Sequence, residues 1–429
     1  MTPEMHRVAP SRSIPMLAVL ALLLVATLIA IALVGARLRI PRELPPPFGL
    51  AATGLFAFDT NGQVVLAEHD GSGIRQLHPS GPGGSAVRAT HDGSRQFGAT
   101  FSRDGTHVAF WQEDGWKVIG GNAEKAADLW VVDVDGSHAM NLTAGLELAP
   151  MPFAPAGTWS PDGSSIAFTA DVDVRMYVVA ADGSAPPRAI GDDTLAPTYP
   201  AWAPDGSLIA FTGIERKADG ELAFPPVPKV YVIRPDGTGQ EQVSRSSGGT
   251  ETGILPQWSP DGRMLLYDVD VSDPDVPPIV DAQGNAVLPE APAPRELVLA
   301  EHGSSGWTER VVVERSARWM ATFSNDGSRI AFLRSRPDMF DGDLFVIGVD
   351  GKGERRVSDR LVNLSSPCWS PDDRTITMLT GPVPADWEQA FGWPNRVYVQ
   401  FPVEGAGLVE IPAGTVAGVL ACSWQRLAP

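Results

Sequence analysis

A short motif recurs along most of this chain: an aromatic residue, a small residue, and then Pro-Asp-Gly or a close variant of it. Its six copies begin at Phe101, Trp159, Trp202, Trp258, Phe323 and Trp369, and their aspartates lie 43 to 65 residues apart. Self-similarity at such a period predicts an array of structural units, each of which buries its faces by stacking on its neighbours.

Each motif is followed by apolar runs of the strand type. After Trp159 these are Ile166–Phe168 and Met176–Val179, and an Asp-Gly pair at Asp182-Gly183 follows the second run. Asp-Gly and Pro-Asp-Gly suit the tight turns of antiparallel hairpins, and β-branched and aromatic residues favour the strands between them. The repeat therefore predicts four antiparallel strands in each unit.

The two ends of the repeat region are each incomplete, and together they make one unit. Val419–Leu427 has the pattern of a first strand, and Gly54–Leu77 supplies the strands that should follow it. Pairing of these two segments closes the array into a ring and protects its sheet edges. We predict an all-β fold, a seven-bladed β-propeller over residues 54–429 that is closed by its N- and C-terminal strands.

The N-terminus carries a different signal. Ser13–Ala36 is 24 residues without a charge, and about 20 apolar residues suffice for a helix to cross a bilayer. We expect a short tail at 1–13, a transmembrane anchor at 14–36 and a proline-rich linker at 37–53. The alternative is a cleaved signal peptide, although apolar regions of that kind are usually shorter, about 7–15 residues. Arginines flank the segment on both sides, so counting them does not orient it.

The repeat Trp-Ser-Pro-Asp-Gly, with Ile-Ala-Phe after it, resembles that of TolB-type β-propellers. It is also similar to the propeller of dipeptidyl peptidase IV and prolyl oligopeptidase relatives. The first resemblance implies a propeller on the extracytoplasmic side of the membrane that binds envelope proteins. The chain departs from that pattern because we see no N-terminal α/β domain before the first blade. One propeller fold hosts many activities, so function has to be argued from the site.

The residues offer little catalytic chemistry. No serine lies in a Gly-x-Ser-x-Gly nucleophile elbow, and no two of the seven histidines have helical metal-ligand spacing. We therefore expect a protein that is not an enzyme and that needs no cofactor. Asp268, Asp270, Asp273 and Asp275 form a weak candidate calcium site, because calcium prefers oxygen ligands. Cys368 and Cys422 are expected to be free buried thiols rather than a bridge.

Charge argues against nucleic acid as a partner. The chain has 51 acidic and 33 basic side chains, a net charge of −18. No basic run offsets this charge, and a negative surface repels phosphates.

Four long insertions all follow the second strand of a unit, at Gln112–Ala127, Gly213–Lys229, Asp268–Arg295 and Gly381–Arg396. In an antiparallel four-stranded unit these connections all emerge on one face. Long loops are usually functional or disordered, and exposed aromatic residues anchor protein interfaces. We predict a protein-binding scaffold in a cell-envelope complex, with Trp116, Phe224, Trp387, Phe391 and Trp393 at the interface. The alternative is an enzyme or small-ligand sensor with its site in the central channel.

Overall fold

The computed structural model divides the chain into two units, Met1–Leu44 and Pro45–Pro429, and every residue it describes lies in the second. The described residues are 51–77, 95–119, 122–146, 148, 157–170, 174–223, 227–244, 255–271, 295–314, 320–335, 341–360, 362–363, 365–381, 393–404, 407–416 and 423–427. The predicted anchor at 14–36 lies outside them. Among the described residues there is no helix that is long and apolar enough to cross a membrane.

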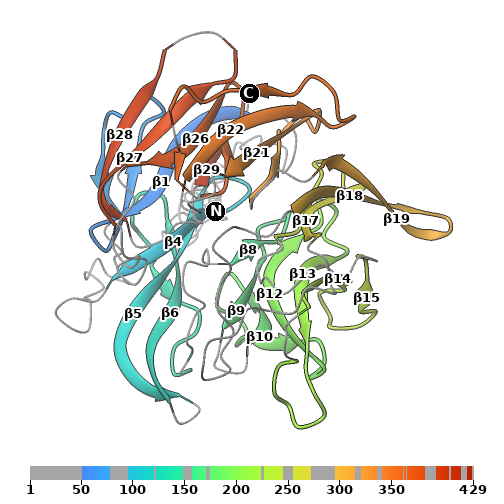
Figure 1. The fold of residues 1–429 in the computed structure, drawn as a ribbon. Coiled ribbons are helices and arrows are strands. Elements are labelled where there is room, and N and C mark those ends of the chain that lie inside the picture. The colour runs from blue at the N-terminus through green and yellow to red at the C-terminus, as the bar shows by residue number, and fades with distance from the viewer. Residues whose placement is uncertain are drawn as a thin grey trace, which may run out of the picture. The chain divides into compact units, whose positions relative to one another are not determined.

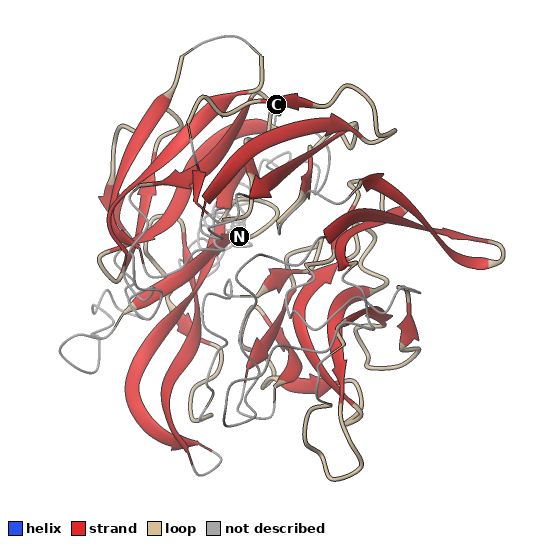
Figure 2. Ribbon diagram, in the orientation of Figure 1, coloured by secondary structure: helices blue, strands red, loops and turns tan. Residues whose placement is uncertain are grey.

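The second unit is a seven-bladed β-propeller, as predicted (Figures 1 and 2). We number the blades along the chain and list the strands of each from its innermost strand outwards. Blade 1 contains β4 (Gln96–Phe101), β5 (His107–Ile119), β6 (Asn122–Asp133) and β7 (Met140–Asn141). Blade 2 contains β8 (Thr158–Trp159), β9 (Ser165–Ala170), β10 (Arg175–Ala180) and β11 (Arg188–Ile190). Blade 3 contains β12 (Leu195–Trp202), β13 (Ile209–Glu215), β14 (Lys229–Ile233) and β15 (Glu241–Gln242).

The remaining blades repeat this order. Blade 4 contains β16 (Gln257–Trp258), β17 (Met264–Asp270), β18 (Arg295–Gly303) and β19 (Gly306–Val313). Blade 5 contains β20 (Thr322–Phe323), β21 (Arg329–Ser335), β22 (Asp341–Gly348) and β23 (Arg355–Arg356), with β24 (Val362–Asn363) also paired to β22. Blade 6 contains β25 (Cys368–Trp369), β26 (Thr375–Thr380), β27 (Trp393–Pro402) and β28 (Val409–Val416). Blade 7 contains β29 (Ser423–Leu427), β1 (Ala52–Thr60), β2 (Gln63–Ala67) and β3 (Arg75–Gln76).

Blade 7 confirms the predicted ring closure. Its innermost strand β29 comes from the end of the chain and pairs antiparallel with β1, with Trp424 opposite Phe56 and Leu427 opposite Ala52. The two rings of the Trp424 and Phe56 pair lie 5.0 Å apart between their centroids. The first described strand and the last one thus share a sheet.

The core lies between the blades. The buried apolar side chains form seven clusters, and each cluster joins two adjacent blades. Between blades 1 and 2, for example, Trp111 packs edge-on against Phe168. Between blades 6 and 7, Phe56 and Phe58 pack on Tyr398. The ring is therefore held by the same kind of apolar contact at every boundary, including the one that the closure creates.

Candidate functional site

The four insertions predicted from the sequence all join a second strand to a third strand, in blades 1, 3, 4 and 6. Because each blade is an antiparallel sheet with its strands in chain order, equivalent connections leave the blades at the same face. We call this the insertion face. The turns that carry the Pro-Asp-Gly motif join first strands to second strands and lie at the opposite face, which we call the turn face.

The insertion in blade 1 was predicted as a loop, and this is wrong over most of its length. Strands β5 and β6 continue through Gln112–Ala127 as one β-ladder that runs from His107 opposite Asp133 to Ile119 opposite Asn122 (Figure 1). The two strands have 13 and 12 residues, against six in each of the equivalent strands of blade 2. A register shift between Glu113 and Trp116 marks a β-bulge in the extension. A paired hairpin therefore extends from blade 1.

The predicted interface residues are only partly within the described chain. Trp116 lies in β5, in the extended hairpin, and Trp393 is the first residue of β27. Phe224, Trp387 and Phe391 lie outside the described residues. In blade 3, the connection after β13 folds back on itself at an isolated bridge between Arg216 and Leu222, and Leu222 is exposed.

The calcium candidate is described at only two of its four aspartates. Asp268 is buried and forms an ion pair with the buried Arg295, so its charge is already balanced inside the blade. Asp270 is the last residue of β17, and Asp273 and Asp275 lie outside the described residues. Within the part that the structure describes, no three His, Cys, Asp or Glu side chains gather in a way that could hold a metal ion.

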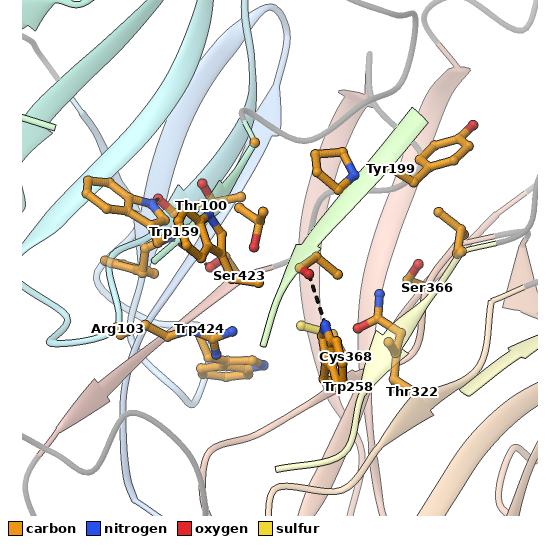
Figure 3. Close-up of a pocket in the computed structure, with 18 of the residues that line it drawn as sticks. Thr100, Arg103, Trp159, Tyr199, Trp258, Thr322, Ser366, Cys368, Ser423 and Trp424 are labelled. Carbon is orange, nitrogen blue, oxygen red and sulfur yellow. Dashed lines mark hydrogen bonds between the residues drawn. The ribbon is translucent and has the colours of Figure 1, made fainter. Parts of the chain in front are cut away.

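A cavity of about 360 Å³ lies at the inner edges of the blades (Figure 3). All seven innermost strands contribute to its wall. Residues that line it include Thr100, Thr158, Ala201, Gln257, Thr322, Cys368 and Ser423, each of which directly precedes the aromatic residue of its strand. The repeat thus surrounds the cavity with a ring of small and mostly polar side chains.

The aromatic residues of the same strands tie neighbouring blades together at the cavity. The indole Nε1 of Trp159 donates to the Thr100 carbonyl (3.3 Å), that of Trp258 to the Ala201 carbonyl (3.0 Å; dashed in Figure 3), and that of Trp369 to the Thr322 carbonyl (3.3 Å). Each bond runs from one blade to the blade before it. A buried indole N–H needs such a partner, so these bonds hold the cavity wall in place.

Two arginines also line the cavity. Arg103 lies in the turn after β4, is half-buried, and appears beside Trp424 in Figure 3. Arg426 lies in β29, is 7% exposed, and donates from Nη1 to Asn325 Oδ1 at 2.7 Å. Burial, together with the nearby charge of Arg426, lowers the pKa of Arg103 to about 10. Burial also lowers the pKa of Arg426. Both groups remain cationic at neutral pH.

Asn325 is itself fixed by the next blade. Asp373 is buried and accepts hydrogen bonds from the Asn325 backbone N–H (2.7 Å), the Asn325 side-chain Nδ2 (2.8 Å) and the Asp326 N–H (2.8 Å). Burial nevertheless raises the pKa of Asp373, since desolvation disfavours the charged carboxylate. A polar cluster of Arg103, Asn325, Asp373 and Arg426 therefore lies at the turn end of the innermost strands.

Sequence reasoning missed this cluster, although a signal for it was present. Arg103, Asn325 and Arg426 all stand two residues after the aromatic residue of their blade, where the other four blades have proline. Asp373 stands where the motif has glycine. In the sequence alone, these four departures from the repeat are indistinguishable from tolerated variation. Closure of the ring brings the four residues together.

The expectation of free cysteines is wrong. Cys368 is disulfide-bonded, and the only other cysteine of the chain is Cys422, which lies outside the described residues. Cys368 is in the innermost strand of blade 6, and Cys422 precedes β29, the innermost strand of blade 7. The bonded Cys368 therefore lies in the blade next to the one that closes the ring.

No protein-family model matches this chain, and no curated protein matches it in sequence. Its fold is similar to several solved structures. TolB from Acinetobacter baumannii is 15% identical, with a TM-score of 0.46 over 88% of this chain and 81% of TolB. The tricorn protease is 14% identical, with a TM-score of 0.53 over 86% of this chain and 35% of the protease.

A prolyl endopeptidase is also similar in fold, at 14% identity, with a TM-score of 0.50 over 86% of this chain and 52% of the enzyme. The chain thus spans about a third of the tricorn protease and about half of the prolyl endopeptidase. At this level of identity the comparisons with the tricorn protease and the prolyl endopeptidase show the fold alone, and TolB and a prolyl peptidase are both among the structures that this chain is similar to. What this chain is, on this evidence, is a seven-bladed β-propeller that is similar in fold to part of the tricorn protease and part of a prolyl endopeptidase.

Proposed function

We propose that this protein is a membrane-tethered, extracytoplasmic propeller that binds a protein partner through its insertion face and does not itself catalyse a reaction. The observation that carries the proposal is the placement of the insertions. All four fall on connections between second and third strands, which reach this face, and the first is built as a paired hairpin, β5–β6. A rigid extension from a propeller blade offers a partner a preformed surface, which lowers the entropic cost of binding.

The proposed location of the protein, anchored in a membrane with its propeller outside the cytoplasm, has separate support. Residues 14–36 are long and apolar enough to span a membrane. The disulfide at Cys368 favours an oxidising compartment, because cytosolic thiols are normally kept reduced. A tether at the N-terminus together with a disulfide in the propeller fits a domain exported across the inner membrane of a bacterial envelope.

The non-enzymatic part of the proposal rests on the sequence. The chain contains no nucleophile elbow. Its similarity to the tricorn protease and to a prolyl endopeptidase covers only part of each enzyme. A second function, ligand binding in the central channel, is supported by an independent observation, the charge of the cavity wall.

Site-directed photo-crosslinking in intact cells tests the insertion face. A photoreactive residue is placed at Trp116 or Leu222, and for the matched controls at Ser164 or Thr238, which lie in turns at the turn face. We expect discrete adducts from the first two positions and none from the controls, with the partner identified by mass spectrometry. Adducts that form equally from both faces, or only from the turn face, would contradict the proposal.

A further inference from the structure

We propose that the central cavity is a binding site for a small carboxylate-bearing ligand. The carboxylate lies between Arg103 and Arg426, and an apolar part of the ligand lies against the tryptophans of the channel. This inference rests on the second proposed function, ligand binding in the central channel, and not on the protein-binding proposal, which is argued from the insertions.

The charge of the cavity wall is the first argument. The protein carries a net charge of −18, yet the charged side chains among the described residues that line the cavity are both arginines, Arg103 and Arg426. Cavities with walls of low dielectric concentrate the field of such charges. The cavity therefore favours anions in a protein whose overall charge repels them.

The second argument is that hydrogen bonds fix the arginine end of the cavity in a defined arrangement. Arg426 is buried, and its Nη1 donates to the side chain of Asn325. Asn325 is held by the Asp373 carboxylate, which accepts two hydrogen bonds from Asn325 and one from the Asp326 N–H. A guanidinium has five N–H donors in a rigid plane, so anchoring one of them orients the others. Burial first, and then the like charge of Arg426, lowers the pKa of Arg103, so its half-buried cation is costly even though Asp373 acts on Arg426 with the opposite charge. A bound anion would offset that cost.

The shape and lining of the cavity select the rest of the ligand. Its volume of about 360 Å³ is at the lower end of the roughly 300–1,000 Å³ typical of ligand pockets. Trp159, Trp202 and Trp258 supply aromatic surface, and Thr100, Thr158 and Ser423 supply hydroxyls. Tyr199, across the cavity from Arg103 in Figure 3, holds a left-handed backbone conformation with φ of 52° directly before Pro200.

Two kinds of ligand carry such a carboxylate, a free small acid and a peptide with a free C-terminus. Isothermal titration of the full-length protein in nonionic detergent separates them, with 3-phenylpropionate as the free acid and N-acetyl-Gly-Phe as the peptide. The corresponding amides, 3-phenylpropionamide and N-acetyl-Gly-Phe-amide, are the uncharged controls. We expect saturable binding of at least one acid, and binding of its amide weaker by about tenfold or more, since the amide loses a charge-assisted contact. The acid with the higher affinity shows whether the ligand is a free small acid or a peptide C-terminus.

The critical variant is Arg103→Pro. It removes one cation and installs the residue that four sister turns carry at this position, as Pro161, Pro204, Pro260 and Pro371, so the fold should be retained and an unchanged Tm confirms this. Arg263→Gln, at a turn arginine whose side chain is 79% exposed, is the matched control for the loss of charge. We expect Arg103→Pro to weaken the acid about tenfold and leave the amide unaffected, and Arg263→Gln to change neither.

Three results would overturn the proposal. These are no saturable binding of either acid to the wild-type protein, equal affinity for acid and amide, and unchanged affinity in Arg103→Pro. Inorganic phosphate is titrated as well, and binding of phosphate without binding of either acid would also overturn it.

Discussion

The serine and aspartate of the repeat are explained by one arrangement of hydrogen bonds. In five blades the serine hydroxyl donates to the aspartate two residues later at 2.5–2.6 Å, and it accepts the backbone N–H five residues later at 2.9–3.0 Å. The aspartate in turn accepts backbone N–H groups within the turn. The motif therefore encodes a turn that satisfies its own polar groups.

We predict that Ser160→Ala lowers the free energy of unfolding by about 1–3 kcal/mol, because it removes a buried hydroxyl that donates to the charged Asp162 and accepts the Ser165 N–H. Urea denaturation followed by tryptophan fluorescence measures this. Blade 3 offers the reverse experiment, since it has Ala203 where the others have serine. Ala203→Ser should stabilise the protein or leave its stability unchanged. If Ala203→Ser lowered the free energy of unfolding as much as Ser160→Ala does, the serine hydroxyl would not be what stabilises the turn.

The proline and glycine of the motif act across blade boundaries. A Cβ added at Gly206, Gly262 or Gly327 would lie 3.4–3.8 Å from the proline of the preceding blade. Between blades 5 and 6 this contact is replaced by Asn325 and Asp373, which hydrogen-bond instead of packing. Asp373 keeps the left-handed conformation that glycine has at this position of the other turns, with a φ of 57°.

This replacement predicts energetic coupling between the two positions. Asn325→Pro and Asp373→Gly each remove half of a hydrogen-bonded pair and should each cost about 1–3 kcal/mol. The double variant copies the proline–glycine contact found at the three boundaries between blades 2 and 5 and should cost less than the two single variants together. Urea denaturation of all four proteins gives the coupling energy, and simple additivity would show that the pair is not coupled.

At the scale of single residues, the sequence was informative wherever the repeat is regular. Trp159, Ser160 and Asp162 predicted their own turn. Arg103, Asn325 and Arg426 could not be interpreted in the same way, because their meaning depends on which blades the ring brings together. Their departure from proline was visible, but the distance between them was not.

Among the elements, hairpin β5–β6 shows why the insertion in blade 1 was misread. Asp114-Gly115 has the composition of a turn, and in the structure it lies at the bulge between Glu113 and Trp116. The ladder then continues to Ile119 and Asn122, which flank Gly120-Gly121 in the sequence. Two turn-like dipeptides in one segment left the sequence ambiguous, and the pairing of β5 with β6 beyond the bulge decided between them.

The closing strand predicts a sharp dependence on the last residues of the chain. Deletion of 423–429 removes β29, uncovers the edge of β1 and removes the buried Trp424. Losing a buried tryptophan alone costs about 3–5 kcal/mol, and an uncovered edge promotes association. We expect oligomers on size-exclusion chromatography and loss of a cooperative thermal transition. Deletion of 428–429 alone should preserve both a monomeric profile and cooperativity.

At the scale of the whole molecule, the turn aspartates act together. The pKa values of Asp162, Asp205, Asp236 and Asp326 lie below the ordinary 3.8, with hydrogen bonds from neighbouring Ser or Thr residues holding each carboxylate charged. Because the unfolded chain binds these protons at a higher pH than the folded one, the stability they contribute is present above about pH 3.8 and is lost as the pH falls below it. Asp373 acts in the opposite direction, since its pKa is raised.

We therefore predict that the thermal midpoint falls steeply on acidification below about pH 4. Differential scanning calorimetry between pH 6 and pH 2.5 measures this. Asp162→Asn removes one of the groups and should make the decline shallower. A thermal midpoint that does not change between pH 5 and pH 3 would contradict the prediction.

The pairing of β29 with β1 has a consequence for the order of events in biosynthesis. Strand β1 is synthesised roughly 370 residues before its partner β29, and at about 5–20 residues per second that delay is roughly 20–70 s. During this time six blades can assemble while the seventh remains an unfinished sheet. A cell that makes this protein therefore needs a means of shielding β1–β3, and a ribosome that stalls before β29 leaves an open ring.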